Sequence, residues 1–325
     1  MKAAVLVGPH RWVVDEVPDP VPGPGQVLIG THVAAICGSD LHAAGEAQGA
    51  LAPGAPGHEA VGTVLSSRTD ALAPGARVLC APPAATARCF AQLQVLPAES
   101  VVPLPATCAA HTMVTAQQLG TAIFALKRFW PSSLGAGTGR SAAVLGCGPA
   151  GLAFVQLLRR AGFAPILASD TSPVRLAAAS EFGATSVVRA PDEDALAAAL
   201  ELTAGVGIEL VIEAAGRDVT RHQAMRMVRL DGRIGLFGLE EHPGLSTFPL
   251  AEVFRRRPTV EMAWGAQFEP GLSSMHTAVQ LILSDPEPAK RLVSHRFPLE
   301  RIGEAFELAR DPARGSLKVA VEPAG

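Results

Sequence analysis

The sequence predicts an α/β protein in which a doubly wound parallel sheet is combined with a second, β-rich domain. From residue 141 onward, short apolar runs alternate with segments of helical periodicity. Before about residue 105, runs rich in Val, Ile and Leu are separated by Pro and Gly clusters such as PDPVPGPG, which is typical of a small barrel. The 325 residues are enough for two hydrophobic cores, and we place the domains at 1–118 with 267–325 and at 119–266.

Each domain has its expected elements. In the first, strands are expected at 3–7, 26–32, 60–65, 76–80 and 91–95, followed by a connecting helix over 116–129. In the second, strands at 142–145, 165–168, 186–189, 207–213, 232–237 and 260–263 alternate with helices at 152–160, 174–182, 192–202 and 219–228. This alternation predicts a parallel sheet with right-handed crossovers. The run Arg255–Arg257 is expected to be a solvated helix end, and a helix at 272–283 precedes the C-terminal segments.

A glycine-rich turn follows the first strand of the second domain. Gly146, Gly148 and Gly151 have the spacing G-x-G-x-x-G and open a helix, in which Pro149 and Ala150 are the next residues. The first glycine permits the tight turn, the second lets a pyrophosphate approach the backbone, and the third lets helix and strand pack closely. The free N–H groups at the start of the helix favour the phosphates. These residues therefore predict a dinucleotide site.

The type of dinucleotide depends on Asp170, at the end of the next strand. A carboxylate in this position accepts hydrogen bonds from the adenosine ribose and repels a 2′-phosphate. No Arg is adjacent to receive that phosphate, since Arg175 lies a turn further on. We therefore expect NAD rather than NADP, and we include Arg175 and Thr121 among the cofactor-binding residues.

Composition limits the other partners. The formal net charge of −3 and the pI near 6.3 give no electrostatic reason to expect nucleic acid or an anionic membrane. The first residues lack the features of a signal peptide, and the five cysteines form no C-x-x-C pair, which favours a reduced, cytoplasmic protein without disulfides. The chain contains no Tyr, which argues against a Tyr/Lys proton-donor mechanism.

Two short motifs in the first domain could carry chemistry. They are CGSDLH at Cys37–His42 and GHEAVGTV at residues 57–64. Together they supply a thiol, two imidazoles and two carboxylates. Zn²⁺ accepts Cys and His ligands, and a carboxylate such as Asp40 often orients a ligating His. From the residues alone, a metal site and a set of buried structural side chains both remain open.

At this point the chain resembles the zinc-containing medium-chain dehydrogenase/reductase family, nearest to its sorbitol and threonine dehydrogenase branch. The matching stretches cover almost the whole length: PxPGPGQVLI at 20–29, CGSDLH, GHEAVGTV, GARV at 75–78, VLGCGPAGL at 144–152, FGAT at 182–185, EAAG at 213–216 and LDGRIGLFG at 230–238. The resemblance implies a Rossmann domain with a GroES-like barrel domain, a small alcohol or ketone as substrate, and a homodimer or homotetramer.

The resemblance also implies roles for the motif residues. Cys37 and His58 would be zinc ligands, with Glu59 beside the metal and able to approach it. Asp40 would hold the ligand histidine. The third protein ligand of the family is usually Glu or Cys at the start of the connecting helix, where this chain has Gln117. With a neutral third ligand the site would keep about one positive charge, so zinc would be held more weakly and a bound alcohol would be more acidic. A metal-free site is the rival interpretation.

Proton transfer would involve two further residues of the first motif. By the same resemblance, Ser39 takes the proton of the alcohol and passes it, through the nicotinamide ribose, toward His42. Most relatives also carry a structural-zinc lobe with four cysteines after the GARV-like turn. Here Cys80 and Cys89 are flanked by APPAATAR, so we expect one catalytic zinc, no structural zinc and two ordinary cysteines.

The sequence thus predicts an NAD-dependent dehydrogenase that transfers a hydride between a secondary alcohol or polyol and the nicotinamide, with zinc assisting deprotonation. Two alternatives remain. One is a zinc-independent medium-chain reductase of the quinone or enone type, and the other is a non-catalytic NAD-binding protein of dehydrogenase descent. Candidate walls of the substrate pocket are Phe90, Phe124 and Trp264, each of which could equally be core.

Overall fold

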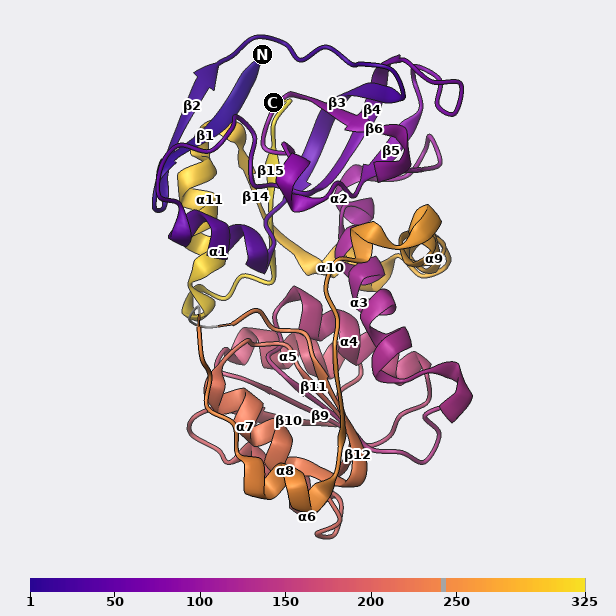
Figure 1. The fold of residues 1–325 in the computed structure, drawn as a ribbon, viewed down its shortest axis with the longest axis vertical. Coiled ribbons are helices and arrows are strands. Elements are labelled where there is room, and N and C mark those ends of the chain that lie inside the picture. The colour runs from indigo at the N-terminus through magenta and orange to yellow at the C-terminus, as the bar shows by residue number, and fades with distance from the viewer. Residues whose placement is uncertain (241–243, 325) are drawn as a thin grey trace. The chain divides into compact units, whose positions relative to one another are not determined.

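The computed structural model describes residues 1–240 and 244–324, which form two compact units. The first unit consists of Met1–Thr121 with Gln267–Gly325, and the second of Ala122–Ala266 (Figure 1). Helix α3 (Thr115–Phe129) crosses the division, and the domain boundary expected after residue 118 falls in this same helix. Among the described residues, no helix has the length and apolar character that a membrane span requires.

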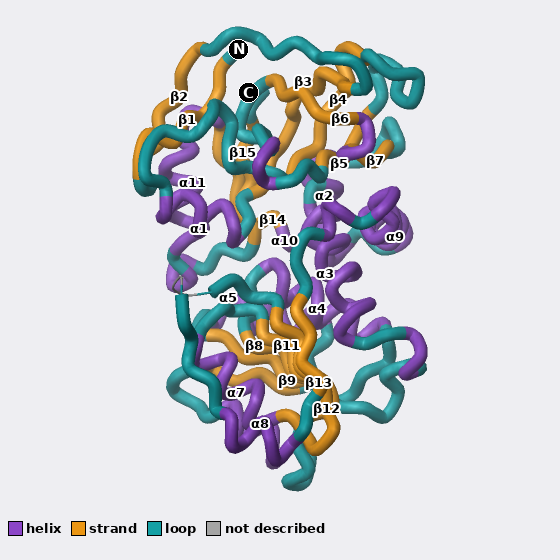
Figure 2. Tube along the Cα trace, in the orientation of Figure 1, coloured by secondary structure: helices purple, strands orange, loops and turns teal. Residues whose placement is uncertain are grey.

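The second unit contains a six-stranded, fully parallel sheet (Figure 2). Its strands are β8 (Ala142–Leu145), β9 (Ile166–Asp170), β10 (Ser186–Arg189), β11 (Ile208–Glu213), β12 (Val228–Leu236) and β13 (Thr259–Met262). Its helices after α3 are α4 (Pro149–Arg160), α5 (Pro173–Phe182), α6 (Ala195–Leu202), α7 (Asp218–Met227) and α8 (Leu250–Arg256). The strand order is β10-β9-β8-β11-β12-β13, the order of a doubly wound nucleotide-binding sheet. The predicted fold class is confirmed for this unit.

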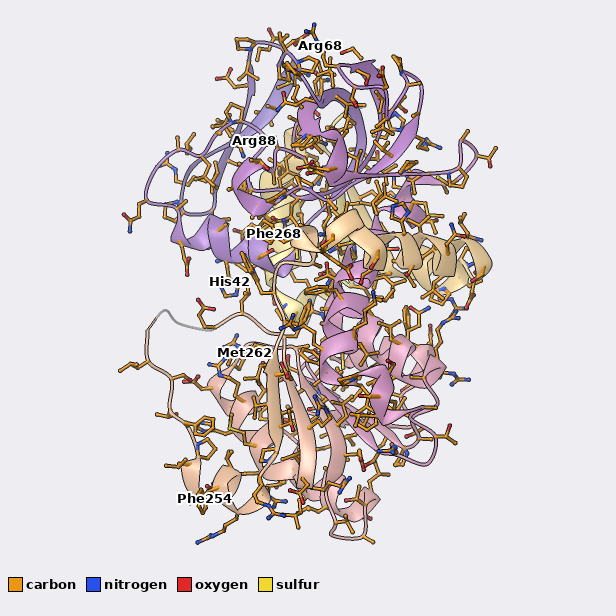
Figure 3. The ribbon with its side chains drawn as sticks, turned by 45° about the vertical axis from the view of Figure 1, so that its right-hand side comes forward. His42, Arg68, Arg88, Phe254, Met262 and Phe268 are labelled. Atoms are coloured by element: carbon orange, nitrogen blue, oxygen red, sulfur yellow. The ribbon has the colours of Figure 1, made fainter. Side chains whose placement is uncertain are left out.

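Local sequence explains the boundaries of these helices. The hydroxyl of Ser172 accepts the backbone N–H of Arg175 and caps the start of α5. Asp194 likewise accepts the N–H groups of Leu196 and Ala197, so α6 begins at Ala195 and not at residue 192, as the apolar pattern had suggested. The expected solvated helix end is the last turn of α8, where Phe254 is 79% exposed (Figure 3).

The first unit is built mainly from β-strands. Its strands are β1 (Lys2–Gly8), β2 (Arg11–Glu16), β3 (Gln26–Ala35), β4 (Glu59–Ser67), β5 (Arg77–Cys80), β6 (Leu93–Pro97), β7 (Val101–Pro103), β14 (Val293–Pro298) and β15 (Lys318–Glu322). Its helices are α1 (Gly38–Glu46), α2 (Ala110–Met113), α9 (Ser273–Ser284), α10 (Glu287–Leu292) and α11 (Ile302–Arg310), with the start of α3. Strands β1 and β2 form a hairpin, and the larger sheet runs β14-β15-β3-β4-β5-β7, with β6 also paired to β3.

An aromatic cluster marks the core of the first unit. The rings of Trp12, Phe90 and Phe306 pack together, with centroids 4.4–6.2 Å apart. Phe90 is fully buried in this core. The interpretation of Phe90 as a wall of the substrate pocket is therefore wrong, because its ring is enclosed by its own domain.

The strand register brings three distant segments to one end of the first sheet. Strand β3 lies between β4 and β15, and its last residue, Ala35, is opposite Glu59 on β4 and Ala320 on β15. The backbone continues this pairing one residue further, where Ile36 N–H donates to Val319 O at 2.9 Å. The end of β3, the start of β4 and the start of β15 therefore meet, and the candidate site is built from the residues at these ends.

Candidate functional site

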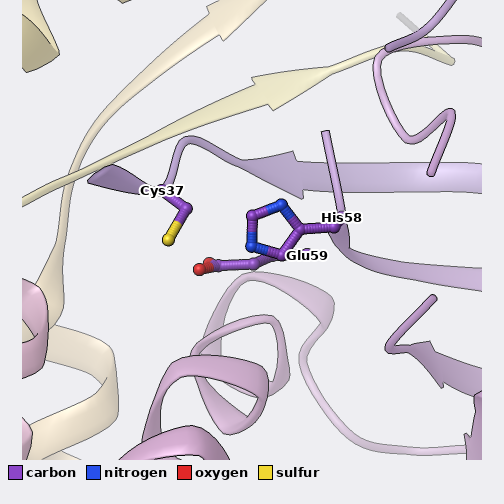
Figure 4. A group of neighbouring side chains, drawn as sticks. All are labelled: Cys37, His58 and Glu59. Atoms are coloured by element: carbon purple, nitrogen blue, oxygen red, sulfur yellow. The ribbon is translucent and has the colours of Figure 1, made fainter. Parts of the chain in front are cut away.

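Three possible metal ligands converge at this end of the sheet. The Cys37 thiol, the His58 imidazole and the Glu59 carboxylate each offer one ligand atom, and these atoms lie within 4.8 Å of one another (Figure 4). Cys37 comes from the turn between β3 and α1, and His58 and Glu59 come from the start of β4. His58 is 6% exposed and Glu59 is fully buried. The two sequence motifs are therefore brought together into one cluster of the first unit.

Asp40 fixes two members of this cluster. It is fully buried in the first turn of α1, where its Oδ2 accepts the backbone N–H of Cys37 at 2.8 Å, as the acid of a capping box does. Its Oδ1 lies 3.0 Å from His58 Nδ1. Burial lowers the pKa of His58, but the Asp40 carboxylate outweighs this effect and raises it well above the ordinary value. A proton held on Nδ1 leaves Nε2 as the nitrogen that can bind a metal.

One member of the cluster, Glu59, forms a buried ion pair. Lys318 Nζ, from the first residue of β15, lies 2.6 Å from Glu59 Oε2, and both side chains have 0% exposure. Burial lowers the pKa of Lys318, yet the Glu59 carboxylate raises it above its ordinary value, so the ammonium form is favoured. The negative charges of Cys37 and Asp40 act in the same direction. Lys318 is therefore part of the electrostatics of the cluster, although neither motif contains it.

Unsatisfied polar atoms indicate that the cluster suits a cation. Within the described residues, the buried Glu59 Oε1 accepts no hydrogen bond. The ion pair with Lys318 is made by the other oxygen, Oε2. Buried carboxylate oxygens without donors are costly, and a metal ion is one group that can satisfy them. Sulfur, imidazole nitrogen and carboxylate oxygen are also the donor types that Zn²⁺ accepts. The residues present therefore fit a zinc ion.

A glutamine from α3 contacts the thiol, but it is not the expected one. Gln118 Oε1 lies 3.9 Å from Cys37 Sγ. Gln117, the predicted third ligand, is also buried, one residue earlier on the same helix. Successive residues of an α-helix point about 100° apart, so the two side chains do not face the same neighbours. Gln118 is the neighbour of the thiol that sequence comparison with the family pattern missed.

The two expected proton carriers lie on α1. Ser39 and His42 are both half-buried and are separated by about one helical turn. The expected relay runs from Ser39 through the nicotinamide ribose to His42, so it stays a prediction. Phe124 is half-buried on α3 and Trp264 is 74% exposed, which leaves their role as pocket walls a prediction as well.

The glycine turn in the second unit has the geometry of a nucleotide cradle. Gly146 has a φ of +95°, which favours glycine, and Gly148 is the residue that caps the start of α4. A Cβ on Gly151 would lie 1.8 Å from the carbonyl oxygen of Gly146, so only glycine allows this close approach. A Cβ on Gly148 would instead enter open space. Pro149 and Ala150 are the first residues of α4, and the arrangement fits a pyrophosphate at the helix start.

Asp170 is joined to this turn. Its Oδ2 accepts the backbone N–H of Cys147 at 2.6 Å, and its Oδ1 accepts the N–H of Ser172 at 2.8 Å. A carboxylate has about four acceptor positions, so two remain for ribose hydroxyls. Arg175 lies in the first turn of α5, and the Thr121 hydroxyl donates to Gln117 O at 3.0 Å. The carboxylate therefore both shapes the turn and remains able to bind a ligand.

Two further cysteines of the first domain, Cys80 and Cys89, share a polar contact. Cys89 Sγ lies 3.3 Å from Gln94 Oε1, and Gln94 Nε2 lies 3.9 Å from Cys80 Sγ. Burial raises the pKa of Cys80 to about 12. Both thiols are fully buried and free of disulfides. They are packed side chains of the first core.

Comparison with known proteins agrees with this arrangement. Residues 23–106 match the family described as "Alcohol dehydrogenase GroES-like domain", and residues 149–284 match "Zinc-binding dehydrogenase". The chain is 30% identical over 340 residues to L-threonine 3-dehydrogenase of Bacillus subtilis (strain 168), with 95% of each chain covered. It is 28% identical to the sorbitol dehydrogenase of Homo sapiens, covering 93% of this chain and 91% of that one. Alcohol dehydrogenase TADH from Thermus sp. ATN1 superimposes with a TM-score of 0.84 at 28% identity over 99% of both chains. The expected GroES-like and Rossmann combination is thereby confirmed.

Proposed function

Because the chain belongs to the zinc-containing medium-chain dehydrogenase/reductase family, we propose that it oxidises a secondary alcohol or polyol, or reduces the matching ketone, with NAD as hydride partner and one zinc ion. The protein is an oxidoreductase acting on CH–OH groups, as its relatives named threonine, sorbitol and alcohol dehydrogenases are. The first unit is the proposed catalytic domain and the second the NAD-binding domain. The observation that carries the proposal is the convergence of Cys37, His58 and Glu59 within 4.8 Å.

Cys37 and His58 are the proposed protein ligands of the zinc ion, with Glu59 able to contribute an oxygen. Asp40 supports this assignment, since it accepts the N–H of Cys37 and binds the imidazole nitrogen that faces away from the cluster. When bound, zinc would polarise the substrate oxygen and lower the pKa of its hydroxyl. Gln117 remains a candidate ligand on the family pattern, while the contact with the thiol favours Gln118 as its polar neighbour.

The charges of the cluster balance a divalent cation. With His58 bound to the metal as a neutral imidazole, a Cys37 thiolate, Asp40 and Glu59 would supply three negative charges, and the buried Lys318 would supply one positive charge. The remaining two negative charges equal the charge of Zn²⁺. This count differs from the estimate based on the ligands alone, which left the site positive. The neutral balance supports zinc binding without an acidic residue at position 117.

Proton handling is proposed for α1. Ser39 Oγ would take the hydroxyl proton of the alcohol and pass it toward the His42 imidazole, which is half-buried and so can exchange protons with water. The buried Asp40 and Glu59 would keep fixed positions, the first by its two hydrogen-bonded neighbours and the second by Lys318. Holding these groups in place costs no rearrangement when the substrate binds.

NAD is proposed for the glycine turn of the second unit. Gly146, Gly148 and Gly151, with Pro149 and Ala150, would surround the pyrophosphate. Asp170 would accept the hydroxyls of the adenosine ribose and disfavour a 2′-phosphate, which supports NAD over NADP. Arg175 and Thr121 complete the proposed cofactor-binding residues.

The test is a screen for NAD reduction with polyols, amino alcohols and sugars, before and after dialysis against a chelator and zinc addition. We expect turnover that falls with the bound zinc and returns when zinc is restored. Cys37→Ser should lower zinc content and turnover together, whereas the control Cys108→Ser, which lies outside the cluster, should retain both. A zinc-free enzyme with full activity would sink the metal assignment, and no turnover with any alcohol or carbonyl compound would favour a non-catalytic protein.

A further inference from the structure

A buried carboxyl group lies beside the glycine turn, at the start of the stretch EAAG at 213–216, and has been given no role so far. Glu213 is the last residue of β11 and is fully buried. Strand β11 pairs with β8, and Glu213 is opposite Leu145, the residue before Gly146. These two strands are the point where the order of the sheet reverses direction, and doubly wound folds bind ligands just outside the strand ends at that point.

The Glu213 side chain holds the backbone turn that follows it. Its Oε1 accepts the N–H groups of Ala215 at 2.9 Å and Gly216 at 2.8 Å, and the Thr220 hydroxyl at 2.7 Å. Ala214 N–H in turn donates to Leu145 O at 2.8 Å. One carboxylate oxygen thus accepts two consecutive backbone N–H groups of the 214–216 turn. These N–H groups have no partner in a sheet or helix, so the carboxylate satisfies them.

The 214–216 turn is packed directly against the glycine turn. A Cβ on Gly146 would lie 2.8 Å from Ala215 N and 2.9 Å from Ala215 Cβ, so the two backbones leave no space between them. On its other side, Gly216 has a φ of +75°, and a Cβ there would lie 1.8 Å from Leu239 O. The 214–216 turn therefore cannot shift without displacing Gly146 or the chain at Leu239.

We propose that Glu213 is a positioning residue for the dinucleotide pyrophosphate. Its carboxyl holds the 214–216 turn in place, and this turn packs against Gly146 and so fixes the position of the glycine turn. This inference rests on the proposed dinucleotide site of the second unit. Within the described residues, the second carboxyl oxygen, Oε2, is buried and accepts no hydrogen bond, so only Oε1 carries the contacts. Burial raises the pKa of the Glu213 carboxyl, and the hydrogen bonds from Thr220, Gly216 and Ala215 oppose this effect.

The experiment measures equilibrium binding of two ligands to the full-length protein by calorimetry. ADP-ribose contains the pyrophosphate, and adenosine lacks it. Glu213→Ala should weaken ADP-ribose binding about tenfold or more and change adenosine binding less than about twofold, because the turn that receives the phosphates loses its support. Glu213→Gln keeps one acceptor oxygen and should bind ADP-ribose within about threefold of the unchanged protein. The control Thr220→Val removes one donor but leaves both backbone N–H groups bonded, so both affinities should persist.

The outcomes separate the two levels of the proposal. If the unchanged protein binds neither NAD nor ADP-ribose, the proposed function fails and this inference fails with it. If it binds both and Glu213→Ala weakens ADP-ribose and adenosine equally, or weakens neither, only the positioning role of Glu213 is overturned. Should Glu213→Ala not fold, Glu213→Asp keeps the charge but shortens the side chain, and the same selective loss is expected. Unchanged ADP-ribose binding by folded Glu213→Asp would contradict the inference.

Discussion

The buried pair of Lys318 and Glu59 allows a prediction about stability. Both side chains have 0% exposure, and Nζ lies 2.6 Å from Oε2. Lys318→Met keeps the length and apolar stem of the side chain and removes only the charge, which leaves Glu59 as an uncompensated buried carboxylate. Removing one partner of a buried pair costs about 3–5 kcal/mol. For a unit of this size the unfolding midpoint should fall by about 6–20 °C.

The assay follows thermal unfolding of the intact protein by calorimetry and by tryptophan fluorescence. In a background in which Trp130 and Trp264 are replaced by Phe, the remaining Trp12 reports on the first unit. The measurement is made after dialysis against a chelator, so that metal binding does not mask the change. Lys2→Met is the matched control, since Lys2 Nζ forms a 2.8 Å ion pair with Glu300 in which both side chains are about half exposed. A surface pair is screened by water and contributes little, so this variant should unfold close to the unchanged protein.

A double variant tests the reason for the effect. Lys318→Met combined with Glu59→Met removes both charges, and replacing a whole buried pair by well-packed apolar residues of similar volume is often neutral or stabilising. We therefore expect the double variant to recover most of the stability lost in Lys318→Met. The reasoning is refuted if Lys318→Met is no less stable than Lys2→Met, or if the second substitution recovers nothing.

Further predictions concern the second unit. Asp170→Ser should lower the preference for NAD over NADP by about tenfold or more, because charge-assisted hydrogen bonds to the ribose are lost. The preference is measured as the ratio of kcat/KM with the two cofactors. A parent enzyme that prefers NADP would contradict this prediction. Gly151→Ala should destabilise the unit by about 1–3 kcal/mol because its Cβ would meet a carbonyl oxygen at 1.8 Å, whereas Gly148→Ala should keep its unfolding midpoint and lose NAD affinity. A hydrogen bond from Arg229 holds the pKa of Glu209 below its ordinary value, so the pair stabilises the fold above that ordinary pKa and loses this contribution as the pH falls through the lowered one. Glu209→Gln should remove that part of the acid destabilisation in unfolding measured between about pH 6 and 3, and an unchanged pH profile would count against the pair.

Much of the fold follows from local sequence, and the misses have physical causes. The runs at Ala142–Leu145 and Ile208–Glu213 are apolar enough to be recognised as buried parallel strands without other information. Helix α1 was not expected, because CGSDLH contains Gly, Ser and Asp, which disfavour helix interiors, and its start is fixed by the Asp40 carboxylate on Cys37 N–H. Strand β2 alternates in burial but faces water along much of its length, which weakens its apolar signal.

The site was predicted where motifs are short and missed where partners are distant in sequence. The resemblance of two short motifs to the family pattern predicted that Cys37 and His58 belong to one site, and the structure brings these two side chains together. Lys318 had only a weak signal, a charge before the apolar residues of the strand KVAVE, and nothing local indicates that its partner is Glu59. The contact between Gln118 and the Cys37 thiol depends on how α3 is rotated about its own axis. A residue-by-residue match with the family pattern does not give this rotation.

The position of β15 has a consequence for synthesis of the protein. Lys318 follows the whole second unit in the chain, whereas Glu59 precedes it. During translation the second unit can therefore fold while the strand that neutralises Glu59 is still inside the ribosome. Until that strand emerges, burying Glu59 would require desolvating an unpaired charge, so this end of the β3–β4 sheet stays hydrated. The first unit is thus completed last, although most of its residues are made first.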